Sequence, residues 1–199
     1  MTGWGAAMAQ RIAILGGTFD PVHVGHLVLA VCAREQLAAD RLLLVPNVRS
    51  PLKSTTPQAS FADRYEMLCL AVGDDSGVSI SDIEGQRGGI SFTIDTLRAL
   101  RDEYAHGEFF LLLGGDALRD FSAWKDHQEV AALAHLVGVQ RGVDPLAPAA
   151  PLKHVIEMPR IDVSSSLLRV RIAAGLTIDF MTPAAVVLYI RSHGLYRRA

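Results

Sequence analysis

GGTFDPVHVGH, residues 16–26, directly follows a short apolar run that begins at Arg11 and has the pattern of a buried strand. It combines two adjacent glycines, an Asp–Pro pair and two histidines three positions apart. In open α/β sheets, ligands bind beyond the carboxyl ends of the strands, and this stretch would lie there. Glycines at that place let backbone N–H groups approach a ligand closely. The stretch therefore indicates both a fold class and a site.

The residue types within this stretch predict a helix start. We expect Asp20 to be the N-cap and Pro21 the first helical residue, so that His23 and His26 face the same way. A helix N-terminus attracts phosphate, and histidine N–H groups add hydrogen bonds, more strongly when protonated. Gly25 would allow close approach of a ligand or of a neighbouring backbone. The residues favour a phosphate site over an ordinary turn with two incidental histidines.

Short apolar runs alternate with helical patterns along the chain. Helical periodicity covers residues 24–37, 62–72 and 91–104, and shorter helices are expected within residues 116–133. The apolar runs are continuous, as in strands covered on both faces, and occupy residues 11–16, 41–46, 77–82, 108–114, 135–139 and 153–158. The alternation predicts an α/β fold with a doubly wound parallel sheet.

The last part of the chain changes character. From residue 164 it predicts two helices, SSSLLRVRIAAG and TPAAVVLYIRSHG, each with a capping Ser or Thr at its start and a Gly after its end. Pro183 would lie in the first turn of the second helix. We expect one domain over residues 11–199, with an α/β core over 11–160 and a small helical part over 161–199. Residues 1–10 are expected to be a disordered extension without signal-peptide features, and the start at Met1 or Met8 is left open.

Composition excludes several classes of function. The chain has 199 residues, a net charge of −2 and 50% hydrophobic residues, which indicates a globular protein. It lacks the basic footprint of nonspecific nucleic-acid binding and any apolar run of the roughly 18 residues that span a membrane. Cys32 and Cys69 lack zinc-site spacing, so we expect reduced thiols in a cytoplasmic protein. An oligomer is neither supported nor excluded.

A second candidate for phosphate binding is DVSSSLLRVRI, residues 162–172. The serines at a helix start supply hydroxyl and N–H donors, and Arg169 lies one turn after Ser165, so both can converge on one anion. The planar guanidinium of arginine suits bidentate binding of phosphate. An ordinary capped helix with a solvated arginine is the alternative.

The stretch at residues 16–26 resembles the signature of the HxGH nucleotidyltransferase superfamily, most closely that of the bacterial nicotinate-mononucleotide adenylyltransferases. This resemblance implies a Rossmann-like nucleotidyltransferase fold. It also implies ATP and nicotinate mononucleotide as partners, nicotinate adenine dinucleotide and pyrophosphate as products, and a role in NAD biosynthesis. Mg²⁺ would accompany ATP, held mainly by the nucleotide and water, with no metal ligands assigned to the protein.

The resemblance also implies site residues. His23, His26 and Arg169 would stabilise phosphate charge, and no general base is needed because the attacking phosphate is already ionised. DVSSSLLR is similar to the family motif ISSTxIR, with Val163 and Ser166 in place of Ile and Thr. The implied ATP contacts are Gly16, Gly17, Thr18, Phe19, His23, His26, Gly114, Asp116, Ser165, Ser166 and Arg169.

Further motifs imply contacts to the mononucleotide. PNVRSPLK is similar to a family pattern with a phosphate-contacting lysine, SFTIDTL to SYTIDTL, and LLLGGDALRDFSAWKD to a segment with a ring-packing aromatic. The implied mononucleotide contacts are Thr18, Lys53, Thr93 and Trp124. The roles of Asp95 and Arg141 stay open.

Two alternatives stay open from the sequence. One is another HxGH adenylyl- or cytidylyltransferase, such as the pantetheine-phosphate enzyme, although these tend to be shorter and lack the combined motifs. The other is a nucleotide-sensing module without turnover. The preference for nicotinate over nicotinamide mononucleotide is also open, because backbone N–H groups can read that difference.

Overall fold

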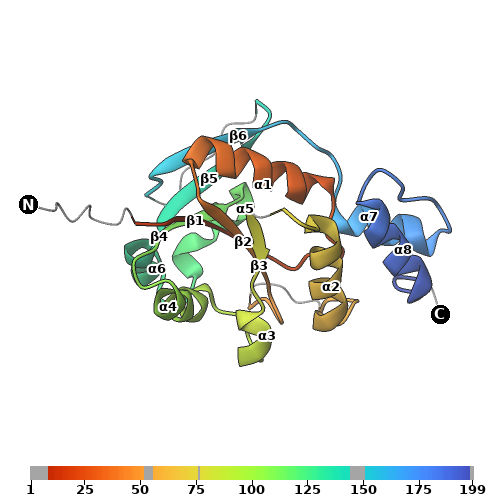
Figure 1. Ribbon diagram of the computed structural model, residues 1–199, viewed down its shortest axis with the longest axis horizontal. Helices are drawn as coiled ribbons and strands as arrows, with labels where there is room; N and C mark the ends of the chain where they lie inside the picture. The colour runs from red at the N-terminus through yellow and green to blue at the C-terminus, as the bar shows by residue number, and fades with distance from the viewer. Residues whose placement is uncertain (1–8, 52–55, 76, 144–150, 198–199) are drawn as a thin grey trace, which may run out of the picture.

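The computed structural model describes residues 9–51, 56–75, 77–143 and 151–197 (Figure 1). Six strands form one sheet in the order β3-β2-β1-β4-β5-β6, and every neighbouring pair is parallel. The strands are β1 (Arg11–Gly17), β2 (Arg41–Pro46), β3 (Val78–Ile80), β4 (Glu108–Leu113), β5 (His135–Arg141) and β6 (His154–Met158). The doubly wound parallel α/β sheet predicted from the sequence is confirmed.

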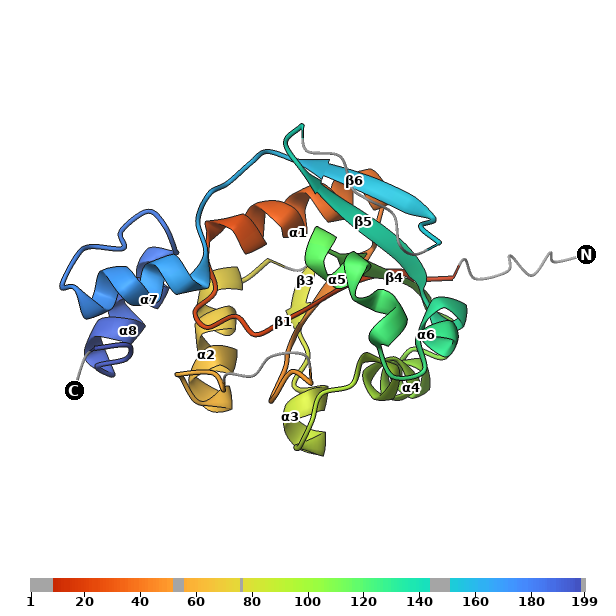
Figure 2. The ribbon, with the colours of Figure 1, turned by 180° about the vertical axis from the view of Figure 1, so that it is seen from behind.

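Helices connect the strands and cover both faces of the sheet (Figures 1 and 2). The helices are α1 (Val24–Leu37), α2 (Phe61–Val72), α3 (Ile83–Arg87), α4 (Thr93–Glu103), α5 (Gly115–Arg119), the 3-10 helix η1 (Phe121–Ala123), α6 (His127–Leu133), α7 (Ser165–Ala173) and α8 (Ala184–Ser192). The three long helices α1, α2 and α4 begin and end within two residues of their predicted bounds. Among the described residues, no helix is long and apolar enough to cross a membrane.

Alternate residues of the four inner strands, β2, β1, β4 and β5, supply two hydrophobic cores, which is why these strands are apolar without alternation. In β1, Ala13 and Leu15 face the core that also contains residues of α1, α2, α7 and α8. Ile12 and Ile14 face the other core, with residues of α4 and α6. Both isoleucines are at most 2% exposed, and burial of such a side chain stabilises by roughly 1.5–3 kcal/mol. The sheet is thereby held from both sides.

The strand order places a topological switch point at β1. From β1 the chain continues to β2 and β3 on one side, then returns to β4 on the other side of β1. The segments that follow β1 and β4 therefore leave the sheet in opposite directions and open a crevice at its carboxyl edge. The glycine-rich stretch predicted to form the site begins there.

The C-terminal helices α7 and α8 lie at the end of the molecule opposite the start of β1, near the start of α1 and beside α2 (Figures 1 and 2). The predicted Ser cap of the first of them is confirmed, because the Ser164 hydroxyl accepts from Leu167 N at 3.1 Å. The predicted Thr cap of the second is wrong, since the N-cap of α8 is Pro183. The Thr182 hydroxyl instead donates to the carbonyl of Val22, at 2.9 Å.

Candidate active site

The helix after β1 starts later than the sequence predicted. Its N-cap is His23, so the assignment of Asp20 as cap and Pro21 as first helical residue is wrong. The Asp20 carboxylate is 4% exposed and is bound elsewhere. It accepts from the backbone N–H groups of Gln58 (2.8 Å) and Ala59 (3.1 Å), next to the start of α2. Asp20 therefore holds the turn after β1 to the start of α2.

The two histidines lie together at the start of α1, as predicted. Their ring centroids are 3.7 Å apart and the planes are tilted by 30°. The His23 backbone N–H donates to His26 Nδ1 at 3.2 Å. Because Nδ1 accepts, the proton of a neutral His26 ring lies on Nε2, which can donate to a ligand.

Gly25 has a packing role that the sequence did not predict. A Cβ added there would lie 3.0 Å from His23 Nδ1 and 3.1 Å from its Cε1. The glycine therefore makes room for the His23 ring, and neither a ligand nor a neighbouring backbone is needed to explain it. The spacing of the histidine pair depends on this missing side chain.

His23 is buried, at 8% exposure, and its Nδ1 has no hydrogen-bond partner. Burial lowers the pKa of His23 to about 4, and the nearby positive charge of Arg141 contributes to the shift. The ring is therefore neutral at pH 7, which differs from the protonated donor that would bind phosphate most strongly. An anion placed beside the ring would favour its charged form and raise this pKa.

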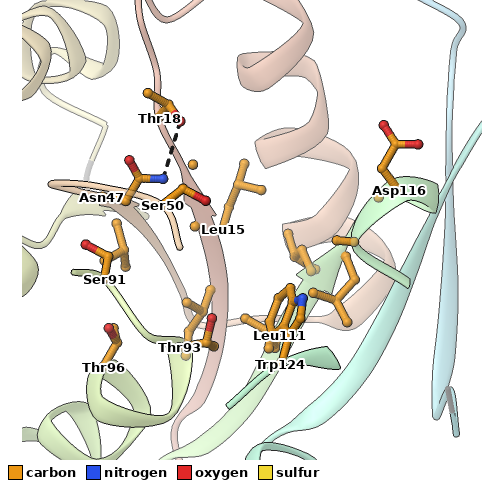
Figure 3. A pocket seen from close by; sticks show the side chains of 18 of the residues that line it. Leu15, Thr18, Asn47, Ser50, Ser91, Thr93, Thr96, Leu111, Asp116 and Trp124 are labelled. Atoms are coloured by element: carbon orange, nitrogen blue, oxygen red, sulfur yellow. Dashed lines mark hydrogen bonds between the residues drawn. The ribbon is translucent and has the colours of Figure 1, made fainter. Parts of the chain in front are cut away.

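A cavity of about 790 Å³ opens at the carboxyl edge of β1 and β4 (Figure 3). This volume lies within the usual range for small-molecule sites, roughly 300–1,000 Å³. Its lining includes most of the predicted contacts, namely Gly16, Gly17, Thr18, His26, Thr93, Gly114, Asp116 and Trp124. The structure thus brings together residues from three separate motifs.

Three buried polar atoms on the cavity wall have no hydrogen-bond partner: Asn47 Oδ1, Glu84 Oε2 and Trp124 Nε1. Figure 3 shows Asn47 beside Thr18, with the bond from Asn47 Nδ2 to Thr18 Oγ1 (3.3 Å), and Trp124 on another side of the cavity. Buried polar groups in native proteins are nearly always paired. Each belongs to a residue that lines the cavity, but the atoms themselves are buried, so a ligand can bond to them only after the side chains move.

Asn47 and Glu84 were not found from the sequence. Asn47 follows β2 directly, and its place beside a predicted strand end was a usable signal. Glu84 accepts from the Thr96 hydroxyl at 2.7 Å. Burial raises the pKa of Glu84, against the hydrogen bonds from Ser91 and Thr96. The surrounding sequence, SDIEGQR, is polar, so it does not indicate that the Glu84 carboxyl is buried.

Phe19 does not line the cavity, although it was predicted to contact ATP. Its ring is 2% exposed and meets the His26 ring edge-on, with centroids 4.9 Å apart. A Cβ at Gly17 would lie 2.9 Å from this ring, so Gly17 is required for the packing. The Phe19 side chain therefore supports the histidine pair by packing against the His26 ring.

The predicted phosphate contacts on α7 also lie outside the cavity lining. The Ser165 hydroxyl donates to the Pro21 carbonyl at 2.8 Å. Arg169 donates from Nη1 to the Asp20 carbonyl at 2.7 Å and from Nη2 to the Ser166 hydroxyl at 3.2 Å. The start of α7 is therefore joined to the start of α1, but its side chains bind the protein itself.

Of the remaining residues, two acidic side chains form ion pairs, one arginine lines the cavity, and one lysine lies outside the described residues. The Asp116 carboxylate is almost fully exposed and pairs with Arg119. Asp95, whose role was left open, pairs with Lys125 at 3.2 Å. Arg141 lines the cavity, and Lys53 lies outside the described residues.

The acidic side chains on the cavity are Glu84, which is buried, and Asp116 and Asp120 on the segment after β4. They do not form a preformed metal centre. In the part of the chain that the structure describes, no three His, Cys, Asp or Glu side chains gather as a metal site would require.

Comparison with known proteins places this geometry in context. Residues 14–171 match the model of a family described as cytidylyltransferase-like. A protein of Desulfitobacterium hafniense (strain Y51), named "Probable nicotinate-nucleotide adenylyltransferase", is 40% identical, over 96% of this chain and 98% of its own. A protein of the same name from Thermus thermophilus is 42% identical, over 94% of this chain and 100% of its own.

Solved structures share the fold. Nicotinic acid mononucleotide adenylyltransferase of Plasmodium falciparum, complexed with NaAD, superposes with a TM-score of 0.77 at 20% identity. The match covers 94% of this chain and 97% of that chain. The same protein complexed with APC gives a TM-score of 0.75, at 20% identity and the same coverage.

Proposed function

The chain belongs to the cytidylyltransferase-like family, with bacterial nicotinate-nucleotide adenylyltransferases as relatives at about 40% identity, and on this premise we propose how it acts. It transfers the adenylyl group of ATP to nicotinate mononucleotide, in NAD biosynthesis. One observation supports this most directly: the rings of the histidine pair at the start of α1 lie 3.7 Å apart, and His26 lines a cavity that Thr93 and Trp124 also line.

The reaction needs positioning and charge stabilisation rather than a general base. An oxygen of the mononucleotide's 5′-phosphate attacks the α-phosphorus of ATP, and the bond from that phosphorus to the bridging oxygen of the β-phosphate breaks. Pyrophosphate leaves with the bonding electron pair. The nucleophile is an ionised phosphate at neutral pH, so no proton has to be removed. The two phosphates repel each other, and donors at the α-phosphate lower that barrier.

His26 is the proposed donor to the α-phosphate. It lines the cavity, and the bond from His23 N to its Nδ1 keeps a proton on Nε2 in the neutral ring. His23 packs against it and would gain positive charge as phosphate charge accumulates nearby. The helix dipole at the start of α1 adds positive potential to the same place.

The start of α7 is the proposed site for the β- and γ-phosphates. Ser165, Ser166 and Arg169 lie beside the start of α1, and the guanidinium retains donors beyond its bonds to Asp20 and Ser166. Lys53 would offset the charge between the two polyanions, and Arg141 adds a cation on the cavity wall.

The mononucleotide is proposed to occupy the end of the cavity formed by Thr93 and Trp124. The indole packs on the pyridine ring or donates from its unpaired Nε1, and Asn47 Oδ1 can accept from a ribose hydroxyl. Thr18 also lines the cavity. These assignments rest on position and unsatisfied hydrogen bonds.

Mg²⁺ bound to ATP is proposed as the metal. Mg²⁺ in nucleotide sites is held mostly by phosphate oxygens and water, so a preformed protein cluster is not required. Asp116 and Asp120 are the carboxylates placed to accept from its water ligands. When bound, the ion neutralises charge on the leaving pyrophosphate. Because the substrates are cytoplasmic metabolites, we also propose a cytoplasmic location.

The test is pyrophosphate release by the purified chain with ATP and Mg²⁺. Nicotinate mononucleotide, nicotinamide mononucleotide and 4′-phosphopantetheine are offered separately as acceptors. We expect release with nicotinate mononucleotide, at a kcat/KM above that for either other acceptor. Release only with 4′-phosphopantetheine would assign a sister activity, and nucleotide binding without any release would assign a sensing module.

A further inference from the structure

The turn that carries His23 is held mainly by the C-terminal part of the chain, besides the bonds from Gln58 N and Ala59 N to the Asp20 carboxylate. We call residues 20–24 the anchor segment. Its bonds to the C-terminal part are Arg169 Nη1 to Asp20 O (2.7 Å), Ser165 Oγ to Pro21 O (2.8 Å), Thr182 Oγ1 to Val22 O (2.9 Å), Val24 N to Met181 O (3.0 Å) and Tyr196 Oη to Asp20 Oδ1 (2.7 Å). The position of His23 within this segment is therefore set from outside the α/β core.

Tyr196 makes the one side-chain-to-side-chain bond in this set. Its ring is 9% exposed, and its backbone has φ +64°, an uncommon conformation for a bulky residue. The hydroxyl donates to a carboxylate that is itself buried, which is a short, charge-assisted bond. Such a conformation persists where surrounding contacts over-determine it, so the ring is held firmly against Asp20.

We propose that Tyr196 is a positioning residue for the adenylyl transfer, acting through Asp20 on the placement of His23 and His26. The inference rests on the proposed function, since it assigns those histidines to the reacting phosphate. Tyr196 is buried, does not line the cavity, and is not among the residues assigned to either substrate.

If the Tyr196 hydroxyl is removed, the position of Asp20 depends on the bonds that its carboxylate keeps. The Asp20 carboxylate would keep the N–H donors of Gln58 and Ala59 and the ion pair with Arg169 at 3.9 Å, but Oδ1 would lose its hydroxyl donor. An under-satisfied buried carboxylate shifts toward its remaining donors, and the adjoining turn shifts with it. A displacement of about 1 Å at reacting groups can cost on the order of 10²-fold in rate. The mononucleotide end, at Thr93 and Trp124, has no part in this contact.

The chain offers a matched control in Tyr189, on α8 of the same C-terminal part. Its hydroxyl also donates to a carboxylate, Asp63 Oδ1, at 3.0 Å. This bond joins α8 to α2 and does not touch the anchor segment. Tyr189→Phe and Tyr196→Phe therefore make the same chemical change, and only the second reaches Asp20.

The experiment compares both variants of the full chain with the wild type. Thermal unfolding establishes that each is folded, steady-state kinetics give kcat and both KM values, and ¹H–¹⁵N imidazole spectra report the two histidine rings. For Tyr196→Phe we expect kcat/KM for ATP to fall by roughly 10- to 100-fold, the KM for nicotinate mononucleotide to stay within about twofold, and the His23 and His26 signals to shift. Tyr189→Phe should keep wild-type kinetics and imidazole signals.

Asp20→Asn supplies the second arm. The double variant combines Asp20→Asn with Tyr196→Phe. If Tyr196 acts through Asp20, its kcat/KM for ATP falls no further than that of the worse single variant, whereas independent effects would multiply the two fold-losses. Should Tyr196→Phe not fold, Asp20→Asn must show the same kinetic loss and shifted imidazole signals. Wild-type kinetics in Tyr196→Phe, multiplying losses, or failure of both variants to fold would each overturn the proposal. An inactive wild type would instead refute the proposed function.

Discussion

The two ends of the cavity are built in opposite ways. At the histidine end, the carbonyls of Asp20, Pro21 and Val22 are each bound by a side chain of the C-terminal part. At the mononucleotide end, buried polar atoms of Asn47 and Trp124 have no partner. The first end is therefore tied to the C-terminal part through its backbone carbonyls, with His23 Nδ1 unpaired among the described residues. No such ties from the C-terminal part are described for Asn47 or Trp124, whose buried polar atoms are unpaired.

This difference matches the chemistry proposed for each end. Stabilising charge in a transition state requires donors that are already in place, because reorganising them during the reaction costs rate. Binding a ring and a ribose requires only groups that gain a hydrogen bond when the ligand enters. Changes at the first end should therefore affect kcat, and changes at the second should affect KM.

The largest effect is expected from His26→Ala. Removing one transition-state donor of this type lowers kcat by roughly 10²–10³-fold. His127→Ala is the control, because His127 also begins a helix but does not line the cavity. Steady-state kinetics on folded variants check the prediction, and near-normal turnover of His26→Ala would contradict the assigned role.

The histidine end should also be sensitive to acid through His23. Its folded-state pKa of about 4 lies below the unfolded value of 6.5, so between these values the unfolded chain binds more protons. Stability is therefore lost as pH falls through this window, by about 2–3 kcal/mol from pH 7 to pH 4.5. Denaturant unfolding of the wild type and of His23→Gln at both pH values measures the difference. An equal loss in both proteins would show that His23 is not responsible.

Arg169→Lys tests the link between the two helix starts. Lysine keeps the charge but not the fork that reaches the Asp20 carbonyl and Ser166 together, so kcat/KM for ATP should fall by roughly 10-fold or more. The control is Arg171→Lys, since Arg171 bonds only to the Thr177 carbonyl among the described contacts. Similar kinetics in the two variants would exclude a special role for Arg169.

The smallest effect is expected at the open end, from Trp124→Phe. Loss of the indole N–H removes one hydrogen bond to the mononucleotide, worth about 1 kcal/mol, so its KM should rise roughly five-fold. The KM for ATP should stay unchanged. A rise in the KM for ATP instead would mean that the indole serves the other substrate.

The strands and long helices could be predicted from the sequence because their signal is local. Leu42, Leu43 and Leu44 are consecutive and all buried, as strands covered on both faces require. The site was predictable where a motif is contiguous, as with His23 and His26. Thr93 and Trp124 were placed by resemblance, and the structure brings both to one cavity.

The parts that could not be predicted depend on contacts between distant segments. Asp20 has the composition of a cap, and only its bonds to Gln58, Ala59 and Tyr196 show that it serves another purpose. Thr182 likewise suits a cap but binds the Val22 carbonyl. Each choice was between two uses of one polar side chain, and tertiary packing decided it.

The anchor segment has a consequence for synthesis of the chain. Its bonding partners lie 144, 149, 160 and 176 positions further along the sequence. Contacts of such high sequence separation close late, because the loop entropy must be overcome first. The histidine turn leaves the ribosome among the first segments, yet it can reach its working geometry only after the last helix has emerged. A partly synthesised chain could thus form much of its sheet while its reacting groups are still unplaced.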